Sequence, residues 1–293
     1  MSDITLTASA RNSLLSLTNT ASLMSRTQSR LTSGMKVASA IDDAVAYFQS
    51  KGLDDRAGDF TNRKEEIDQG ISSLKGALNG ATTVDTILKQ MKGIVKSVAT
   101  ADKQTRIALS QQFTDLAKQI SSVVQDTSYQ GLHLIDNSSA KLTVYFNEGT
   151  SASLSVKAQN LKQSVLITTL AAASAIQSKA MTVAGFSVIS AAKASTGGAA
   201  ATLAKLSAVL DKSISKIRSV SAQLGGNVTF LQTRMDFTSN YVNTMQEGSG
   251  KLTLADLNTE GANLVALQTR QQIGVQSLSI AGQQQQSILS LLR

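Results

Sequence analysis

The two ends of the chain carry the same spacing of apolar residues. In residues 7–35, apolar side chains recur at alternating steps of three and four, with Gln28 interrupting. The members of this stripe are Ala10, Leu14, Leu17, Ala21, Met24 and Leu31. This narrow spacing is the signature of a coiled-coil helix, and a single helix in water cannot bury its apolar stripe. The pattern therefore predicts a helix that needs a partner.

The same spacing returns near the end of the chain and offers that partner. Its members are Leu264, Leu267, Leu278, Ala281, Ile288 and Leu292, with Gln271, Gly274 and Gln285 at the intervening positions. Because polar and small residues interrupt it, this stripe is marginal as an isolated helix. We expect the two terminal segments to pair, and to be loosely ordered until they do.

Three further helices are predicted between the ends, over about residues 61–98, 109–123 and 203–245. The last of these contains Gly225 and Gly226, which should weaken it locally by about 1 kcal/mol each.

A different pattern follows the second of these helices. Residues 142–146 and 152–156 alternate apolar and polar side chains on either side of a turn at 147–151, which predicts a β-hairpin. Residues 161–200 are rich in Ala, Ser and Thr, and are expected to form a short variable insert at the surface.

The predicted fold is mainly α. Long antiparallel, coiled-coil-like helices form by pairing of the N- and C-terminal regions, and a small β-hairpin region is added to them. Residues 1–42 and 255–293 are the expected terminal helices, and residues 43–160 and 201–254 the expected helical rod with its hairpin.

Composition strengthens the helical prediction. Typical usage of about 5% would give on the order of 15 prolines in a chain of this length, and there are none. Proline in a helix interior costs roughly 3 kcal/mol or more, so its absence suits long uninterrupted helices. The 4% share of aromatic residues favours aliphatic helix packing over a deep globular core.

Candidate chemistry is scarce. There is no Cys and a single His, His133, which is expected to be a structural loop residue. The sequence contains no phosphate-binding glycine loop, nucleophile elbow or metal-ligand cluster, so no enzyme activity, cofactor or metal is expected. The net charge of +8 comes from scattered Lys and Arg without aromatic platforms, so no nucleic-acid partner is expected.

The pattern predicts neither a membrane-spanning helix nor a secretory signal peptide. The longest uncharged apolar-leaning run, residues 165–178, is too short for the roughly 20 residues of a bilayer-spanning helix, so no membrane insertion is expected. The first residues lack the basic cluster and apolar run of a secretory signal peptide.

Two motifs resemble the terminal signatures of bacterial flagellins. Residues 30–45 read RLTSGMKVASAIDDAV; residues 252–264 read LTLADLNTEGANL, and QQSILSLLR ends the chain. A third, Tyr129-Gln130-Gly131, resembles the family's aromatic-x-Gly motif before its hairpin. The signature residues are Arg30, Leu31, Gly34, Asp42, Asp43, Ala255, Asp256 and Glu260. The chain thus resembles a flagellin with a short central variable region.

The N-terminal motif also has a local physical interpretation. Ser39 and Asp42 have the spacing of a capping box for the following helix, and Gly34 permits a break after the terminal helix. Asp42 and Asp43 are alternatively catalytic or metal-binding carboxylates, but no His or Cys lies near them.

The resemblance implies a helical homopolymer, the extracellular flagellar filament. In flagellins the terminal helices line an inner tube, the adjoining helices form an outer tube, and the central insert projects outward. The implied polymerisation interface is Leu14, Leu17, Met24, Leu31, Leu264, Leu267, Leu278, Ile288, Leu291, Leu292 and Arg293. The implied partners are the flagellar export apparatus, the filament cap, hook-junction proteins and a cytosolic chaperone at the C-terminal helix, with export through the type III apparatus and no cleaved signal peptide.

Two alternatives stay open from the sequence. A hook–filament junction protein shares the paired terminal helices, although such proteins tend to have prolines around the Asp-Asp motif and this chain has none. A coiled-coil scaffold accounts for the heptads but not for the two signatures. One departure from the family concerns Gln283–Gln286, which stand where the C-terminal motif usually carries a proline.

Overall fold

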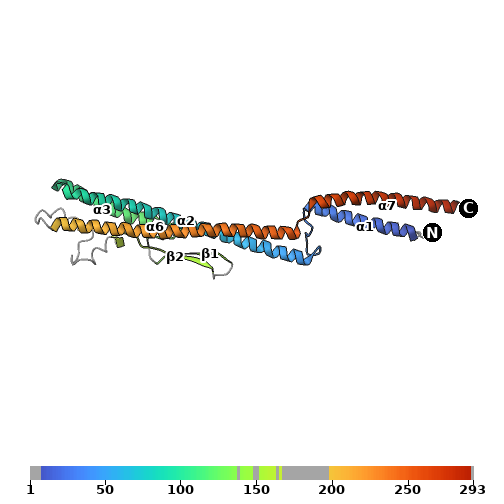
Figure 1. Ribbon diagram of the computed structural model, residues 1–293, viewed down its shortest axis with the longest axis horizontal. Helices are drawn as coiled ribbons and strands as arrows, with labels where there is room; N and C mark the ends of the chain where they lie inside the picture. Colours follow the sequence, from blue (N-terminus) through green and yellow to red (C-terminus); the bar gives the residue numbers. More distant parts are fainter. Residues whose placement is uncertain (1–7, 137–138, 148–151, 163–164, 167–197, 292–293) are drawn as a thin grey trace. The chain divides into compact units, whose positions relative to one another are not determined.

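The computed structural model describes residues 8–136, 139–147, 152–162, 165–166 and 198–291. Its helices are α1 (Ala8–Ser33), α2 (Ala44–Thr100), α3 (Lys103–Asp126), α6 (Gly198–Thr253) and α7 (Leu257–Leu291). Its strands are β1 (Lys141–Tyr145) and β2 (Ser153–Lys157). The prediction of a mainly helical chain with a small hairpin is confirmed (Figure 1).

The chain forms two compact units. The terminal unit comprises residues 1–58 and 242–293, and the central unit comprises residues 59–241. Both divisions fall inside helices, within α2 and within α6. The unit that holds the chain ends therefore extends beyond the predicted terminal segments into the helices next to them.

In the central unit, α2, α3, α6 and the hairpin share one apolar core. Its largest fully buried side chains include Ile67, Leu74, Leu88, Met91, Ile120, Leu210, Ile217 and Leu231. They recur along each helix at the three-and-four spacing predicted from the sequence, because only one stripe of a helix can face its neighbours. α6 continues without a break through Gly225 and Gly226.

The hairpin is confirmed with the expected alternation. β1 and β2 are antiparallel and pair Leu142 with Val156 and Val144 with Leu154. Val144 and Val156 are buried against the helices. Gly70 of α2 makes this approach possible, because a Cβ there would lie 2.7 Å from Val144 Cγ2.

The predicted surface insert begins too early at residue 161. Leu161 and Leu166 are buried in the core of the central unit, and the Leu166 carbonyl accepts a hydrogen bond of 2.7 Å from the buried Ser213 hydroxyl of α6. At the other end, residues 198–200 already belong to α6. The remainder of the predicted insert, residues 167–197, lies outside the described residues.

Candidate polymerisation interface

The two signature motifs lie side by side in the terminal unit. Gly34 ends α1 with φ +70° and donates its N–H to the Arg30 carbonyl at 2.8 Å, a left-handed cap that favours glycine. The predicted break at Gly34 is confirmed. Beyond it, the Lys36 N–H donates to the Thr253 carbonyl at 2.8 Å, and the Ala255 N–H donates to the Gly34 carbonyl at 2.9 Å. Residues more than 200 positions apart are thus joined backbone to backbone.

An ion pair joins the same motifs through side chains. Arg30 Nη1 of α1 donates to Glu260 Oε1 of α7 at 3.0 Å. Glu260 lies in the first turn of α7, where the helix dipole favours a negative charge. Its side chain is only 11% exposed, and Arg30 places the opposite charge directly beside it.

Two of the three signature aspartates cap the helices that follow them. Asp256 accepts from the Asn258 N–H at 3.0 Å and from the Thr259 hydroxyl at 2.8 Å, which caps α7. Asp43 caps α2 by accepting from the Ala46 N–H at 3.0 Å. The hydroxyl of Thr259, followed by backbone N–H donors, holds the pKa of Asp256 below its ordinary value.

The predicted capping box of Ser39 and Asp42 is wrong. Asp42 accepts from the N–H groups of Ala38 and Ser39, each at 3.1 Å, and from the Ser39 hydroxyl. These bonds close a turn before the helix rather than capping it, because α2 begins only at Ala44, with Asp43 as its cap. The Ser39 hydroxyl and the two N–H groups lower the pKa of Asp42.

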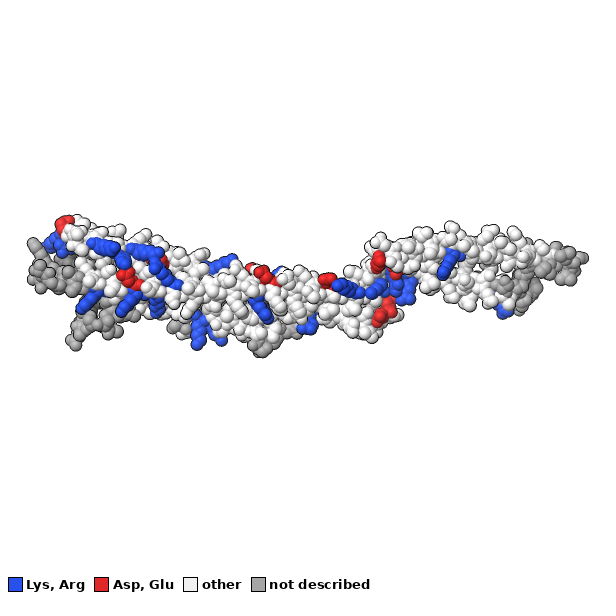
Figure 2. Space-filling view, in the orientation of Figure 1, with Lys and Arg blue, Asp and Glu red and all other residues white. Residues whose placement is uncertain are grey.

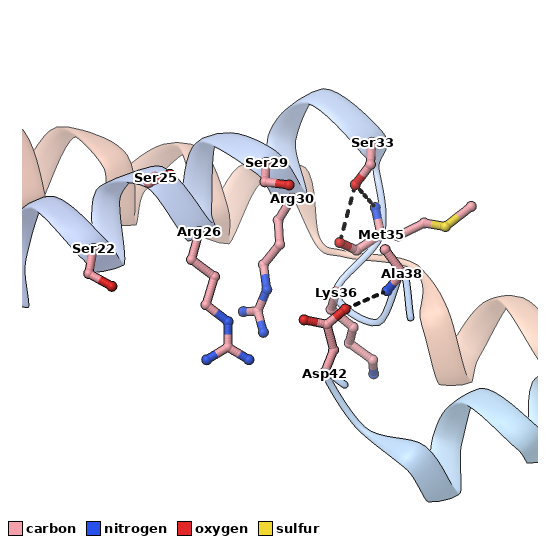
Figure 3. Close-up of a pocket in the computed structure, with 10 residues that line it drawn as sticks. All are labelled: Ser22, Ser25, Arg26, Ser29, Arg30, Ser33, Met35, Lys36, Ala38 and Asp42. Atoms are coloured by element: carbon pink, nitrogen blue, oxygen red, sulfur yellow. Dashed lines mark hydrogen bonds between the residues drawn. The ribbon is translucent and has the colours of Figure 1, made fainter. Parts of the chain in front are cut away.

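A polar surface cavity of about 360 Å³ adjoins this turn (Figure 3). Arg26 and Arg30 extend from α1 on the same side as Asp42, and Ser22, Ser25, Ser29 and Ser33 supply hydroxyls. The described residues include no group of acids or histidines able to hold a metal ion. No described helix has the length and apolarity needed to cross a bilayer. Asp42 and Asp43 accept hydrogen bonds from backbone N–H groups here.

α1 pairs with α7, but it turns a different face to its partner from the one predicted. The sheltered positions of its seam are Ala10, Ser13, Leu17, Thr20, Met24, Thr27 and Leu31. Leu14 is 45% exposed, and Ala21 and Gln28 are also exposed. The assignment of Leu14 and Ala21 to the seam is therefore wrong, whereas that of Leu17, Met24 and Leu31 is right.

The seam of α7 follows the predicted spacing. Its sheltered positions are Glu260, Leu264, Leu267, Gln271, Gly274, Leu278 and Ala281. Gly274 has a packing role, because a Cβ there would lie 2.9 Å from Leu17 Cδ1. The side chains of Ile288 and Leu291, together with Leu292 and Arg293, lie outside the described residues.

Large apolar side chains remain on the outside of the pair. On α1 these are Leu14, Leu15 and Leu23; on α7 they are Leu257, Val265, Ile273, Val275 and Ile280. The sequence pattern missed Val265, Ile273 and Ile280, although an apolar residue on every side of a helix is itself the signal of a helix buried all round. Figure 2 shows few charged side chains on the visible face of this pair.

Comparison with known proteins agrees with this arrangement. Residues 4–140 match the bacterial flagellin N-terminal helical region, and residues 207–292 match the bacterial flagellin C-terminal helical region. The chain is 28% identical to flagellin FljM of Caulobacter vibrioides, over 100% of this chain and 99% of that protein. It is also 28% identical to flagellin C of Rhizobium meliloti, over 91% and 92% of the two chains.

Among solved structures, a putative flagellar hook-associated protein from Vibrio parahaemolyticus shares the fold with a TM-score of 0.58. That likeness has 15% sequence identity and covers 73% of this chain and 100% of the other. The two family regions span both paired ends and most of the core helices, in the order expected from the motifs. The chain belongs to the bacterial flagellin family.

Proposed function

We propose that this chain is a structural subunit of the extracellular flagellar filament and polymerises through the α1–α7 pair of its terminal unit. The observation that carries the proposal is the outer face of α7, where Val265 is 62% and Ile273 is 60% exposed. A lone α1–α7 pair leaves this face in water. Further copies of the chain, added along a helix, would cover it.

The charges of the pair support a surface that is covered in use. From residue 261 to the end of the described part of α7, the only charged residue is Arg270. The described part of α1 contains Arg11, Arg26 and Arg30 and no acid. A permanently exposed helix of a soluble protein usually carries many charges, whereas the core of an interface is depleted of them.

Polymerisation would add the apolar burial that the α1–α7 seam lacks. Ser13, Thr20 and Thr27 on α1 and Gln271 on α7 occupy seam positions that an independent coiled coil fills with Leu or Ile. The pair is therefore weak alone and gains apolar burial when copies associate. Contacts between different faces of successive copies do not close into a ring, and they generate a helical assembly.

The finer assignments follow from family membership. The pair α1–α7 would line the inner tube and the central unit the outer tube, with the short central insert projecting outward. The polymerisation interface would include Leu14, Leu17, Met24, Leu31, Leu264, Leu267, Leu278, Ile288, Leu291, Leu292 and Arg293. Export would proceed through the type III apparatus without a cleaved signal peptide, with a chaperone on α7 and with cap and hook-junction proteins as further partners.

Paired variants of α7 test the proposal. Val265→Ser with Ile273→Ser removes two side chains that are more than half exposed, while Gln272→Ser with Gln276→Ser changes exposed polar positions of the same helix. Burial of the two apolar side chains is worth about 2 kcal/mol per added copy, or roughly thirtyfold in critical concentration.

The assay is seeded polymerisation, measured by sedimentation and by negative-stain electron microscopy. We expect the unaltered chain and the Gln272/Gln276 variant to form filaments at similar concentrations. Equal polymerisation by the Val265/Ile273 variant would remove the outer face of α7 from the interface. A chain that stays soluble with seeds would contradict the filament proposal and would favour a junction or scaffold role.

A further inference from the structure

A stripe of aromatic rings runs along α6 in the central unit, apart from the stripe that faces the core. Phe230, Arg234, Phe237 and Tyr241 recur at steps of four, three and four, so they share one side of the helix. The Phe237 and Tyr241 rings are stacked with centroids 5.9 Å apart. Tyr241 also meets Phe60 of α2 edge-on at 5.1 Å. These contacts hold the rings in fixed orientations.

Arg234 is fixed within this aromatic stripe. The guanidinium carbon lies 5.1 Å from the centroid of Phe146, which follows β1, and 4.9 Å from that of Phe237. Its Nε is buried and has no hydrogen-bond partner among the described residues. No carboxylate of the described residues pairs with it. The stripe therefore holds a positioned cation without a counter-charge.

The rings beside Arg234 are partly open to water. Phe230 is 49% and Phe237 is 51% exposed, in a chain in which only 4% of residues are aromatic. Aromatic and Arg side chains are the residue types most enriched at binding hot spots, and rigid side chains lose little entropy on binding. This combination indicates a preformed contact surface that includes both apolar area and a positive charge.

A complementary surface lies on α2 of the same unit. Residues 59–68 contain Asp59, Glu65, Glu66 and Asp68 against two basic residues, in a chain whose net charge is +8. Glu66 pairs with Arg63 at 2.6 Å. Glu65 and Asp68 are exposed and have no ion pair among the described residues.

The two surfaces face different sides of the central unit. Phe146 places the aromatic stripe on the side of the hairpin, because its ring meets both Phe230 and Arg234. On α2, Glu66 marks the hairpin side, since it lines the cleft beside β1. At about 100° per residue, Glu65 is turned roughly 100° and Asp68 roughly 160° away from Glu66.

We propose that the aromatic stripe of one copy binds the Glu65–Asp68 surface of the next copy, as a side-to-side contact of central units within the filament. This inference rests on the proposed function, since it requires polymerisation. Arg234 meets the two carboxylates while Phe230 and Phe237 are buried around the contact. Because each copy presents both surfaces on different sides, the contact is heterologous and propagates from copy to copy.

Charge reversal tests the contact from either side. The variants are Arg234→Glu on α6, and Glu65→Lys with Asp68→Lys on α2. Lys216→Glu is the control, since it makes the same reversal of charge at an exposed cation elsewhere on α6. We expect each reversal to raise the critical concentration for seeded polymerisation about tenfold or more, through like-charge repulsion, and the control to change it by less than about twofold.

A mixture of the two reversed variants in equal amounts separates contact between copies from effects within one copy. In the mixture the new acid on one variant faces the new lysines on the other, so we expect polymerisation near that of the unaltered chain. The inference is overturned if Arg234→Glu polymerises like Lys216→Glu, or if the mixture is no better than its components while circular dichroism shows both folded. Failure of the unaltered chain to polymerise would instead overturn the proposed function and this inference together.

Discussion

Replacing Glu260 by Gln should loosen α1 from α7 in the free subunit. The substitution preserves the size of the side chain and removes the charge that faces Arg30 across 3.0 Å. Arg30 is then left with a neutral partner at the point where the two signature motifs meet. We expect the effect to appear along α1 and α7 and to leave the core of the central unit unchanged, because that core belongs to a separate compact unit.

The size of the expected stability loss follows from the burial of the Glu260 and Arg30 side chains. Removing one partner of a fully buried pair costs about 3–5 kcal/mol, whereas an exposed pair contributes less than about 1 kcal/mol. The Glu260 side chain is 11% exposed and that of Arg30 is 29% exposed, which places this pair between the limits. We therefore expect a loss of about 1.5–2.5 kcal/mol, a large share of the stability of a seam that contains so many polar residues.

Hydrogen exchange of the monomer, measured by mass spectrometry, reports this loss directly. Since 1.4 kcal/mol corresponds to a factor of ten, the protection of α1 amides should fall about 10- to 60-fold, with α3 amides as the internal reference. A double-mutant cycle with Arg30→Gln isolates the pair itself. Unchanged protection, or a coupling energy below about 0.5 kcal/mol, would refute the reasoning.

Two further predictions concern helix packing and capping. Gly80→Ala should lower the melting temperature of the central unit, because its Cβ would lie 2.5 Å from Thr127 Oγ1. Gly93→Ala, where a Cβ meets open space, should raise the melting temperature, because alanine in place of glycine adds up to about 1 kcal/mol to the free energy of unfolding. Calorimetry of both variants checks this pair, and a destabilised Gly93→Ala would contradict it. Asp256→Ala should destabilise the first turn of α7, because it removes the side chain that caps this helix. Because Thr259 lowers the pKa of Asp256 below 3.8, the capping energy is present above pH 3.8 and is lost as pH falls through the lower folded pKa. Acid titration of helicity should therefore show a smaller loss in this variant than in the unaltered chain, and an equal loss would contradict the capping role.

Sequence periodicity predicted the elements whose apolar stripe is buried within the same chain. The core helices and the hairpin belong to this class, since their alternation reflects contacts in the central unit. Periodicity placed the start of the second helix at about residue 61 instead of Ala44, because large apolar residues in its first turns face water: Val45 is 67% and Phe48 is 65% exposed. A segment with few apolar residues buried in its own chain carries no readable apolar stripe.

The seam of α1 shows a second limit of the pattern. Hydrophobicity alone selects Leu14 and Ala21, but Ser13 and Thr20 occupy the sheltered positions. Both sets have a coiled-coil spacing, and the choice between them depends on where Leu17 and Leu31 meet α7. The error at Ser39 and Asp42 is similar, because two adjacent aspartates offer two caps and only the backbone decides which one the helix uses.

The polar seam and the apolar outer face have a joint consequence for assembly. Had the leucines of α1 been gathered at Ser13, Thr20 and Thr27, the pair with α7 would be more stable alone and the outer face of α1 would be polar. The sequence instead divides the apolar residues of the pair between the seam and the outer face, so that the seam alone buries only part of them. On the proposed function, the seam is only marginally stable in the free subunit, and addition to the filament would strengthen it because neighbouring copies would bury Leu14 and Val265.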